Sequence, residues 1–192
     1  MTTRRLFIPA VLVAIAAGSA SAYALPGRTA DSPPPAALSR ARTADDALPG
    51  AAAAAASSRG LAVAQGRRVA DGVYLVPATN SNKLCLVTLA NNEMRGSCDG
   101  SGKFFGGHQF MFTIGEEGSP ANPSSVTIAG IARPSVATIR ADYPDGTSQD
   151  ARPSPDGGFS LVIDGPAAAD PTKIDALDST GAVIDSLAGP TR

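Results

Sequence analysis

Two cysteines constrain the fold of this chain more than any other feature, because Cys85 and Cys98 are the only cysteines among its 192 residues. Cys85 lies in residues 84–89 (LCLVTL), and Cys98 ends residues 94–98 (MRGSC). Apolar and β-branched residues predict that the first segment is a strand, and the intervening residues ANNE are typical of a turn. The two segments therefore predict a β-hairpin.

The register of this hairpin follows from the residue numbers. Facing positions of an antiparallel hairpin have a constant sum of residue numbers, and Leu89 with Met94 has the same sum as Cys85 with Cys98. Both sulfur atoms should face each other on one side of the hairpin, and we predict a disulfide between them. A redox or metal-binding role would need a C-x-x-C motif or neighbouring ligands, and the sequence has neither.

Residues 1–22 have the three parts of an export signal. Two arginines within the first five residues precede an apolar run, residues 6–17, and Ala20 and Ala22 then form the small-x-small pattern of a cleavage site. The alternative is an uncleaved anchor helix, but the run is shorter than the roughly 20 residues of a membrane span and contains Pro9. We therefore predict a cleaved signal peptide and no stable membrane insertion afterwards.

Export agrees with the cysteine pair, because disulfides form by default in oxidising compartments. The expected location is secreted or cell-envelope associated. Without residues 1–22 the chain is weakly acidic, since it loses two of its 16 basic residues and keeps 17 acidic ones. A nucleic-acid partner is not expected, because such binding requires a concentrated basic surface.

Residues 23–66 form an Ala- and Pro-rich leader that resembles a linker, but two features favour short helices. Thr43 followed three positions later by Asp46 is a capping-box pattern. Residues 51–56 are all alanine, which has the highest helix propensity, and Gly60 would end that helix. An alanine helix needs an apolar partner, and the strand at 84–89 is apolar on both faces, as in strands covered from both sides.

The remaining chain predicts a mainly β protein. Residues 67–116 should form a small β unit that holds strand 73–76, the hairpin and strand 110–114. Residues 117–125 are polar, contain two prolines and are expected to be a connector.

Residues 126–192 alternate apolar and polar positions, with turn sequences between them. The expected strands are residues 126–128, 137–141, 159–163, 174–177 and 183–184. Short strands at near-regular spacing are typical of an immunoglobulin-like β-sandwich. A unit of this size has a thin core, so we expect it to pack on the first β unit.

Three stretches form a longer pattern: residues 42–49, then residues 73–77 with 84–87, and then residues 128–132 with an Asp-Gly pair downstream. The pattern resembles that of uncharacterised secreted proteins of high-GC Gram-positive bacteria, in which a Cys…Cys hairpin unit precedes an immunoglobulin-like region. The resemblance implies that the Ala-rich leader belongs to the folded unit. It implies no activity and no functional residues.

The candidate ligand loop is residues 99–109 (DGSGKFFGGHQ), which brings together Lys103, Phe104, Phe105 and His108. Glycines and paired aromatic residues in one loop favour contact with a ligand or partner. The competing interpretation is that the two phenylalanines plug the open end of a sheet, since this chain has few large core residues.

Catalysis is not expected from the sequence. The single histidine could serve a Ser-His-Asp site, but no Gly-x-Ser-x-Gly, His-Glu-x-x-His or phosphate-binding motif occurs. Aspartates in the turns lack the alternate spacing of a calcium loop, so neither a metal nor a cofactor is predicted.

We therefore expect a non-catalytic extracytoplasmic binding module, whose partner is an extracellular or cell-envelope protein or glycan. The alternative is a secreted hydrolase or hydrolase inhibitor. The position of His108 bears on the choice, because a histidine buried beside an acid favours chemistry.

Overall fold

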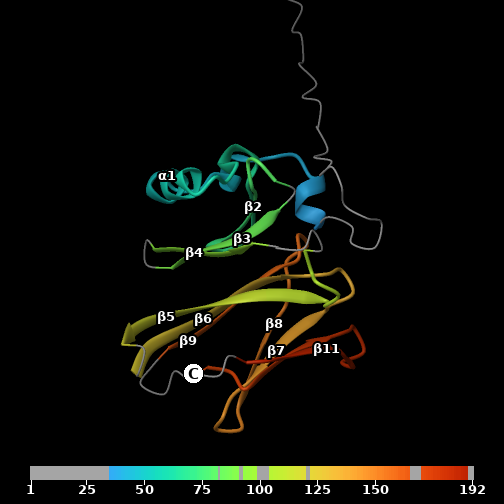
Figure 1. Ribbon diagram of the computed structural model, residues 1–192. Helices are drawn as coiled ribbons and strands as arrows, with labels where there is room; N and C mark the ends of the chain where they lie inside the picture. The colour runs from blue at the N-terminus through green and yellow to red at the C-terminus, as the bar shows by residue number, and fades with distance from the viewer. Residues whose placement is uncertain are drawn as a thin grey trace, which may run out of the picture.

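The computed structural model describes residues 35–81, 83–90, 93–98, 104–119, 122–164 and 170–189. The predicted signal peptide, residues 1–22, and Lys103 lie outside this part of the chain. The described residues are mainly β, with eleven strands in three antiparallel sheets. The strand orders are β1-β2-β3-β4, β5-β6-β9 and β11-β10-β7-β8. Figure 1 shows α1 and these sheets stacked as layers along the molecule.

The helices are η1 (Ala36–Ser39), η2 (Ala44–Asp46), α1 (Gly50–Ser58) and η3 (Val63–Gln65). The strands are β1 (Arg67–Ala70), β2 (Val73–Pro77), β3 (Leu84–Ala90), β4 (Glu93–Cys98), β5 (Phe110–Ser119), β6 (Asn122–Ala132), β7 (Thr138–Asp142), β8 (Ser148–Ala151), β9 (Gly158–Asp164), β10 (Lys173–Leu177) and β11 (Val183–Ala188).

The cysteine hairpin has the predicted register. Strands β3 and β4 pair with Cys85 opposite Cys98 and Leu89 opposite Met94, and a disulfide joins the two cysteines. The crosslink fastens β4, which is an edge strand of its sheet, to the buried strand β3. The prediction of the disulfide is confirmed.

The leader folds against the first sheet, which provides the apolar partner that its alanine helix needs. Ala52 and Ala56 on α1 are buried in one core with Tyr74 of β2 and with Cys85 and Val87 of β3. Small side chains allow the helix to lie close to the sheet, where burial supplies the stability that a nine-residue helix lacks by itself. The predicted helix is confirmed, and so is the covering of the strand at 84–89.

Strand β6 lies between two further cores and contributes to both. Val126 and Ile128 belong to the core shared with the β11-β10-β7-β8 sheet. Ala129 and Ile131 belong to the core shared with β1, β2 and β3. Because side chains alternate along a strand, one strand serves both faces of the middle layer. The β5-β6-β9 sheet is therefore covered on both sides.

The β5-β6-β9 sheet and the β11-β10-β7-β8 sheet enclose the largest core, and together they form a β-sandwich. Its buried residues come from both sheets: Phe110, Val126, Ile128, Ala132, Phe159 and Leu161 from the first, and Ile139, Ala141, Ile174 and Ala176 from the second. Phe110 and Phe159 meet edge to face, with ring centroids 6.5 Å apart.

Glycine brings the first sheet close to the sandwich. A Cβ atom at Gly158, the first residue of β9, would overlap the backbone carbonyl of Val69 in β1. Ser154 Oγ also donates a hydrogen bond of 2.7 Å to the carbonyl oxygen of Val69. The two β units therefore pack against each other directly.

The structure differs from the predicted segment boundaries at one point. Residues 117–125 are not a connector, because residues 117–119 extend β5 and residues 122–125 begin β6. The two strands pair along their length, with a change of register between Glu117 and Gly118. Proline and glycine are tolerated here because the bulge and the strand ends need fewer ladder hydrogen bonds. Strand β5 consequently belongs to the sandwich.

Candidate functional site

A pocket of about 500 Å³ lies where several loops meet at one end of the sandwich. Its walls come from residues 35–36 of the leader, Phe105, the β6–β7 connection at residues 132–136 and the β8–β9 loop at residues 153–157. We call it the end pocket. Four of its lining residues are prolines, which hold these loop segments at fixed backbone angles.

The aromatic residues of the predicted ligand loop lie in the interior. Phe104 and Phe105 are both buried and belong to the core between the first and middle sheets. Their rings pack edge to face with centroids 5.2 Å apart. This is the arrangement that the core interpretation of the loop expects, although Phe105 also reaches the wall of the end pocket.

Arg133 is the cation of the end pocket. Its guanidinium lies over the ring of Phe105, 4.6 Å from the centroid, and its Nε atom donates a hydrogen bond of 3.1 Å to the carbonyl oxygen of His108. These contacts fix the plane of the guanidinium. No carboxylate among the described residues forms an ion pair with Arg133.

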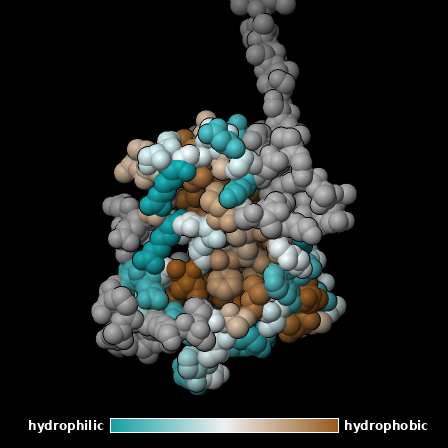
Figure 2. All heavy atoms as spheres, viewed as in Figure 1, coloured by the Kyte–Doolittle hydropathy of each residue, from teal (hydrophilic) through white to brown (hydrophobic). Residues whose placement is uncertain are grey.

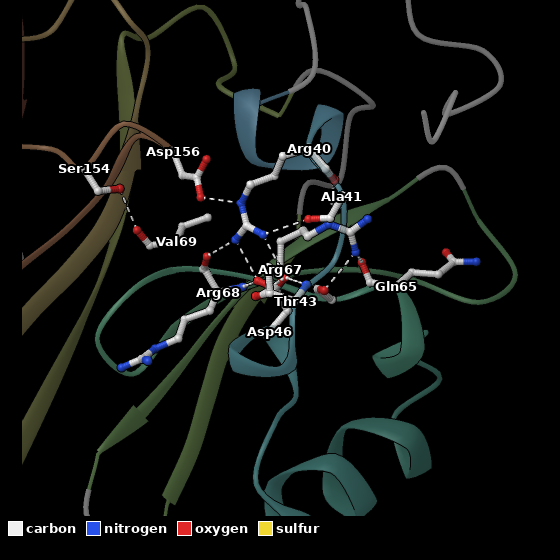
Figure 3. A network of polar contacts seen from close by, with 11 residues as sticks. Arg40, Ala41, Thr43, Asp46, Gln65, Arg67, Arg68, Val69, Ser154 and Asp156 are labelled. Atoms are coloured by element: carbon white, nitrogen blue, oxygen red, sulfur yellow. Dashed lines mark hydrogen bonds and ion pairs between the residues drawn. The ribbon is translucent and has the colours of Figure 1, made fainter. Parts of the chain in front are cut away.

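Asp156 supplies a carboxylate to another part of the pocket wall. Its Oδ2 atom accepts a hydrogen bond of 2.6 Å from Nε of Arg40. Arg40 also donates to both carboxylate oxygens of Asp46, at 2.7 Å each, and to the carbonyl oxygens of Ala41 and Arg68. All five N–H groups of Arg40 are thus used, and Figure 3 shows the guanidinium at the centre of this network.

Asp46 is fully buried and stays ionised because of its partners. Burial by itself would raise the pKa of this carboxyl, but hydrogen bonds from Arg40 and from the backbone N–H groups of Thr43 and Arg68 outweigh it and hold the pKa well below 3.8. The Arg40 guanidinium in turn has a raised pKa. The network therefore ties the leader to β1 and to the β8–β9 loop, beside the end pocket.

His108 lies on the surface beside one acid. Its Nδ1 atom is 3.3 Å from Oδ1 of Asp185 in β11, and its side chain is 49% exposed. The other oxygen of Asp185 accepts a hydrogen bond of 2.6 Å from the backbone N–H of Gln109. No hydroxyl group of the described residues is hydrogen-bonded to the His108 ring. The pair attaches the loop to β11, and no described hydroxyl group completes a Ser-His-Asp arrangement around this histidine.

Burial by itself would raise the pKa of Asp185. The hydrogen bonds from Gln109, His108 and Ser186 together outweigh this effect, so the pKa of Asp185 lies below its usual value. Asp185 is therefore ionised at neutral pH and accepts hydrogen bonds from the loop without needing a proton of its own.

The residues that the structure describes contain no group of three histidine, cysteine or acidic side chains that could hold a metal ion. No helix in that part of the chain is long and apolar enough to cross a bilayer. The large exposed hydrophobic residues include Val183 (56% exposed) and Ile184 (37%) on the edge strand β11. Figure 2 shows hydrophobic residues gathered at the surface over this part of the molecule.

Comparison of the chain with protein-family models, with curated proteins and with solved structures finds no match. The site must therefore be judged on its own geometry. Sequence reasoning named Phe105 and His108 but missed Arg133, Asp156 and Arg40. The capping-box pattern at Thr43 and Asp46 was the one available signal, since Asp46 is the residue that Arg40 meets.

Proposed function

We propose that this protein is a non-catalytic extracytoplasmic binding module and that the end pocket is its ligand site. The observation that carries the proposal is the pocket itself. Its volume of about 500 Å³ lies in the range of small-molecule sites, and its wall combines apolar surface with the polar groups of Arg133 and Asp156. A mostly apolar pocket with a few polar groups suits the recognition of a small ligand.

An immunoglobulin-like relationship is part of this proposal, and the strand order supports it. Numbered within the sandwich from β5 to β11, the first, second and fifth strands form one sheet, and the third, fourth, sixth and seventh form the other. In immunoglobulin-like domains the loops gather at the two ends of the sandwich, and one end often binds ligands. The end pocket lies between two such loops, β6–β7 and β8–β9.

The extracytoplasmic location is proposed on two grounds. The Cys85–Cys98 disulfide is typical of an oxidising compartment. Residues 1–22 have the composition and cleavage pattern of an export signal. The resemblance to secreted proteins of high-GC Gram-positive bacteria is consistent with both and stays a prediction.

A ligand-observed NMR screen tests the binding function. The purified protein would be exposed to small organic molecules that are neutral, acidic, basic and zwitterionic. Ala36 lines the end pocket and is exposed, so Ala36→Trp fills the pocket without entering a core. Ala54 is exposed on α1 and distant from the pocket lining, which makes Ala54→Trp the matched control.

Binding in the end pocket predicts ligands that give saturation-transfer signals with the unmodified protein and with Ala54→Trp, and weak or no signals with Ala36→Trp. If neither this screen nor a screen of short peptides gives a ligand whose binding Ala36→Trp weakens, the proposal is overturned. Melting temperatures of both variants establish that each is folded under the conditions of the screen.

A further inference from the structure

The end pocket carries opposite charges on different parts of its wall. Arg133, in the β6–β7 connection, has no carboxylate partner among the described residues. Asp156, in the β8–β9 loop, shares the single positive charge of Arg40 with Asp46. Arg133 therefore brings a positive charge to the lining without a carboxylate partner among the described residues, whereas Asp156 brings a carboxylate that shares the Arg40 guanidinium, behind the lining, with Asp46.

Arg133 lines the pocket and has N–H groups that can pair with a carboxylate. Its Nε–H group is used by the carbonyl oxygen of His108, and one face of its guanidinium is covered by Phe105. The edge formed by Nη1 and Nη2 makes no hydrogen bond with the described residues. Two parallel N–H groups on a fixed plane match the two oxygens of a carboxylate, and such paired contacts are among the stronger hydrogen bonds in proteins.

Asp156 lines the pocket and has one carboxylate oxygen that can pair with a cation. Oδ2 is used by Nε of Arg40, and Oδ1 accepts no hydrogen bond from the described residues. Because the other four N–H groups of Arg40 are directed to Asp46 and to backbone carbonyls, Arg40 has no further donor for Oδ1. Most of the other residues that line the pocket are apolar, among them Ala132, Val136 and the prolines.

We propose that the end pocket binds short free peptides by both of their termini. The α-carboxylate pairs with Nη1 and Nη2 of Arg133, the α-ammonium donates to Oδ1 of Asp156, and apolar side chains contact the wall between them. This inference rests on the proposed function, because it assigns a ligand class to the same pocket. A volume of about 500 Å³ is in the range that accepts ligands larger than a single amino acid.

The test uses a mixed library of di- to tetrapeptides of alanine, leucine, phenylalanine and proline in four forms. These are the free peptides, the N-acetylated peptides, the C-terminal amides and the peptides capped at both ends. Each cap removes one charged hydrogen bond, so we expect the affinity to fall about tenfold or more per cap. Affinities are measured by isothermal titration calorimetry on library members that NMR identifies as ligands.

Two conservative variants assign each terminus to its residue. Arg133→Gln should bind free acids and amides alike while still preferring a free amino terminus. Asp156→Asn keeps a carbonyl oxygen for Arg40 and should lose only the preference for a free amino terminus. Arg152 is exposed and precedes the pocket-lining Pro153, so Arg152→Gln is the matched control and should behave as the unmodified protein does.

The outcomes separate this inference from the function on which it rests. If ligands of the small-molecule screen bind in the end pocket but the free peptides do not, or if capping leaves peptide affinity unchanged, the peptide assignment is wrong and the binding function stands. If neither the screen nor the peptide library gives a ligand that Ala36→Trp weakens, both proposals are wrong. Unchanged melting temperatures of the variants exclude loss of the fold as the cause.

Discussion

Arg40 and Asp46 meet through two parallel hydrogen bonds, from Nη1 to Oδ2 and from Nη2 to Oδ1, each of 2.7 Å. Asp46 is fully buried, whereas the side chain of Arg40 is 30% exposed. The pair joins η2 of the leader to a residue only six positions earlier, and Arg40 then extends to Asp156 in the sandwich.

Replacing Asp46 with alanine should destabilise the protein by about 3 kcal/mol. The substitution leaves Arg40 without its main partner and removes the acceptor for the backbone N–H groups of Thr43 and Arg68. Urea unfolding measures the loss. Asp45 is exposed beside it, so Asp45→Ala is the control and should change stability little. Equal stabilities of the two variants would contradict the structural role of the pair.

Acid should weaken the fold through the same carboxylate. The pKa of Asp46 in the folded protein is held well below 3.8, so its contribution is fully present above the unfolded value and is lost as pH falls below about 4. The free energy of unfolding, measured from pH 7 to pH 2, should therefore fall less steeply in Asp46→Asn than in the unmodified protein. Parallel profiles would show that other carboxylates account for the acid sensitivity.

Reduction of the Cys85–Cys98 disulfide should cost about 3 kcal/mol, because the crosslink closes a short loop and limits the unfolded chain. The measurement is thermal or urea unfolding with and without a reducing agent, with intact mass to verify the redox state. The double variant Cys85→Ala, Cys98→Ala should be less stable and indifferent to the reductant. A reductant effect of the same size in that variant would refute the assignment.

Gly158→Ala should destabilise by about 1 to 3 kcal/mol, because the new methyl group would overlap the backbone of Val69 and force β1 away from β9. Gly50 offers a matched control at the start of α1, where a Cβ atom would meet nothing within 4 Å. Gly50→Ala should leave stability unchanged or raise it slightly. The free energies of unfolding of both variants are measured by chemical denaturation. If Gly158→Ala is as stable as the unmodified protein, the sheets that contain β1 and β9 can separate at little cost in free energy.

Local patterns were sufficient to predict the hairpin and the helix. Cys85 and Cys98 could be placed opposite each other because hairpin register depends only on the turn and the alternation of side chains. Residues 51–56 could be assigned to a helix because propensity and the following Gly60 agree. In both cases neighbours along the chain decide the conformation.

Two strands escaped sequence analysis because tertiary pairing, and not their composition, forms them. Strand β8 has the sequence SQDA, is largely exposed and is held by its hydrogen bonds to β7. Strand β1 has the sequence RRVA and depends on β2 and on contact with β9. Weak local propensity is readily overridden in such edge positions.

The end pocket could not be predicted from the sequence, since its wall assembles segments that are far apart in the chain. Phe105, Arg133 and Asp156 come from three different connections, and the leader adds residues 35–36. No spacing rule relates them. Loop residues of this kind can be assigned to a site only after the sheets that carry the loops are known.

Strand β6 is buried on both faces, so the first sheet and the sandwich cannot be separated without exposing one of those faces. Cutting the chain between the first sheet and the sandwich would leave Ala129 and Ile131 as part of a bare apolar wall on the middle layer, and such a fragment would be expected to aggregate. The sandwich therefore cannot be transplanted on its own as a free-standing domain. Any graft would have to include the leader and all of the first sheet.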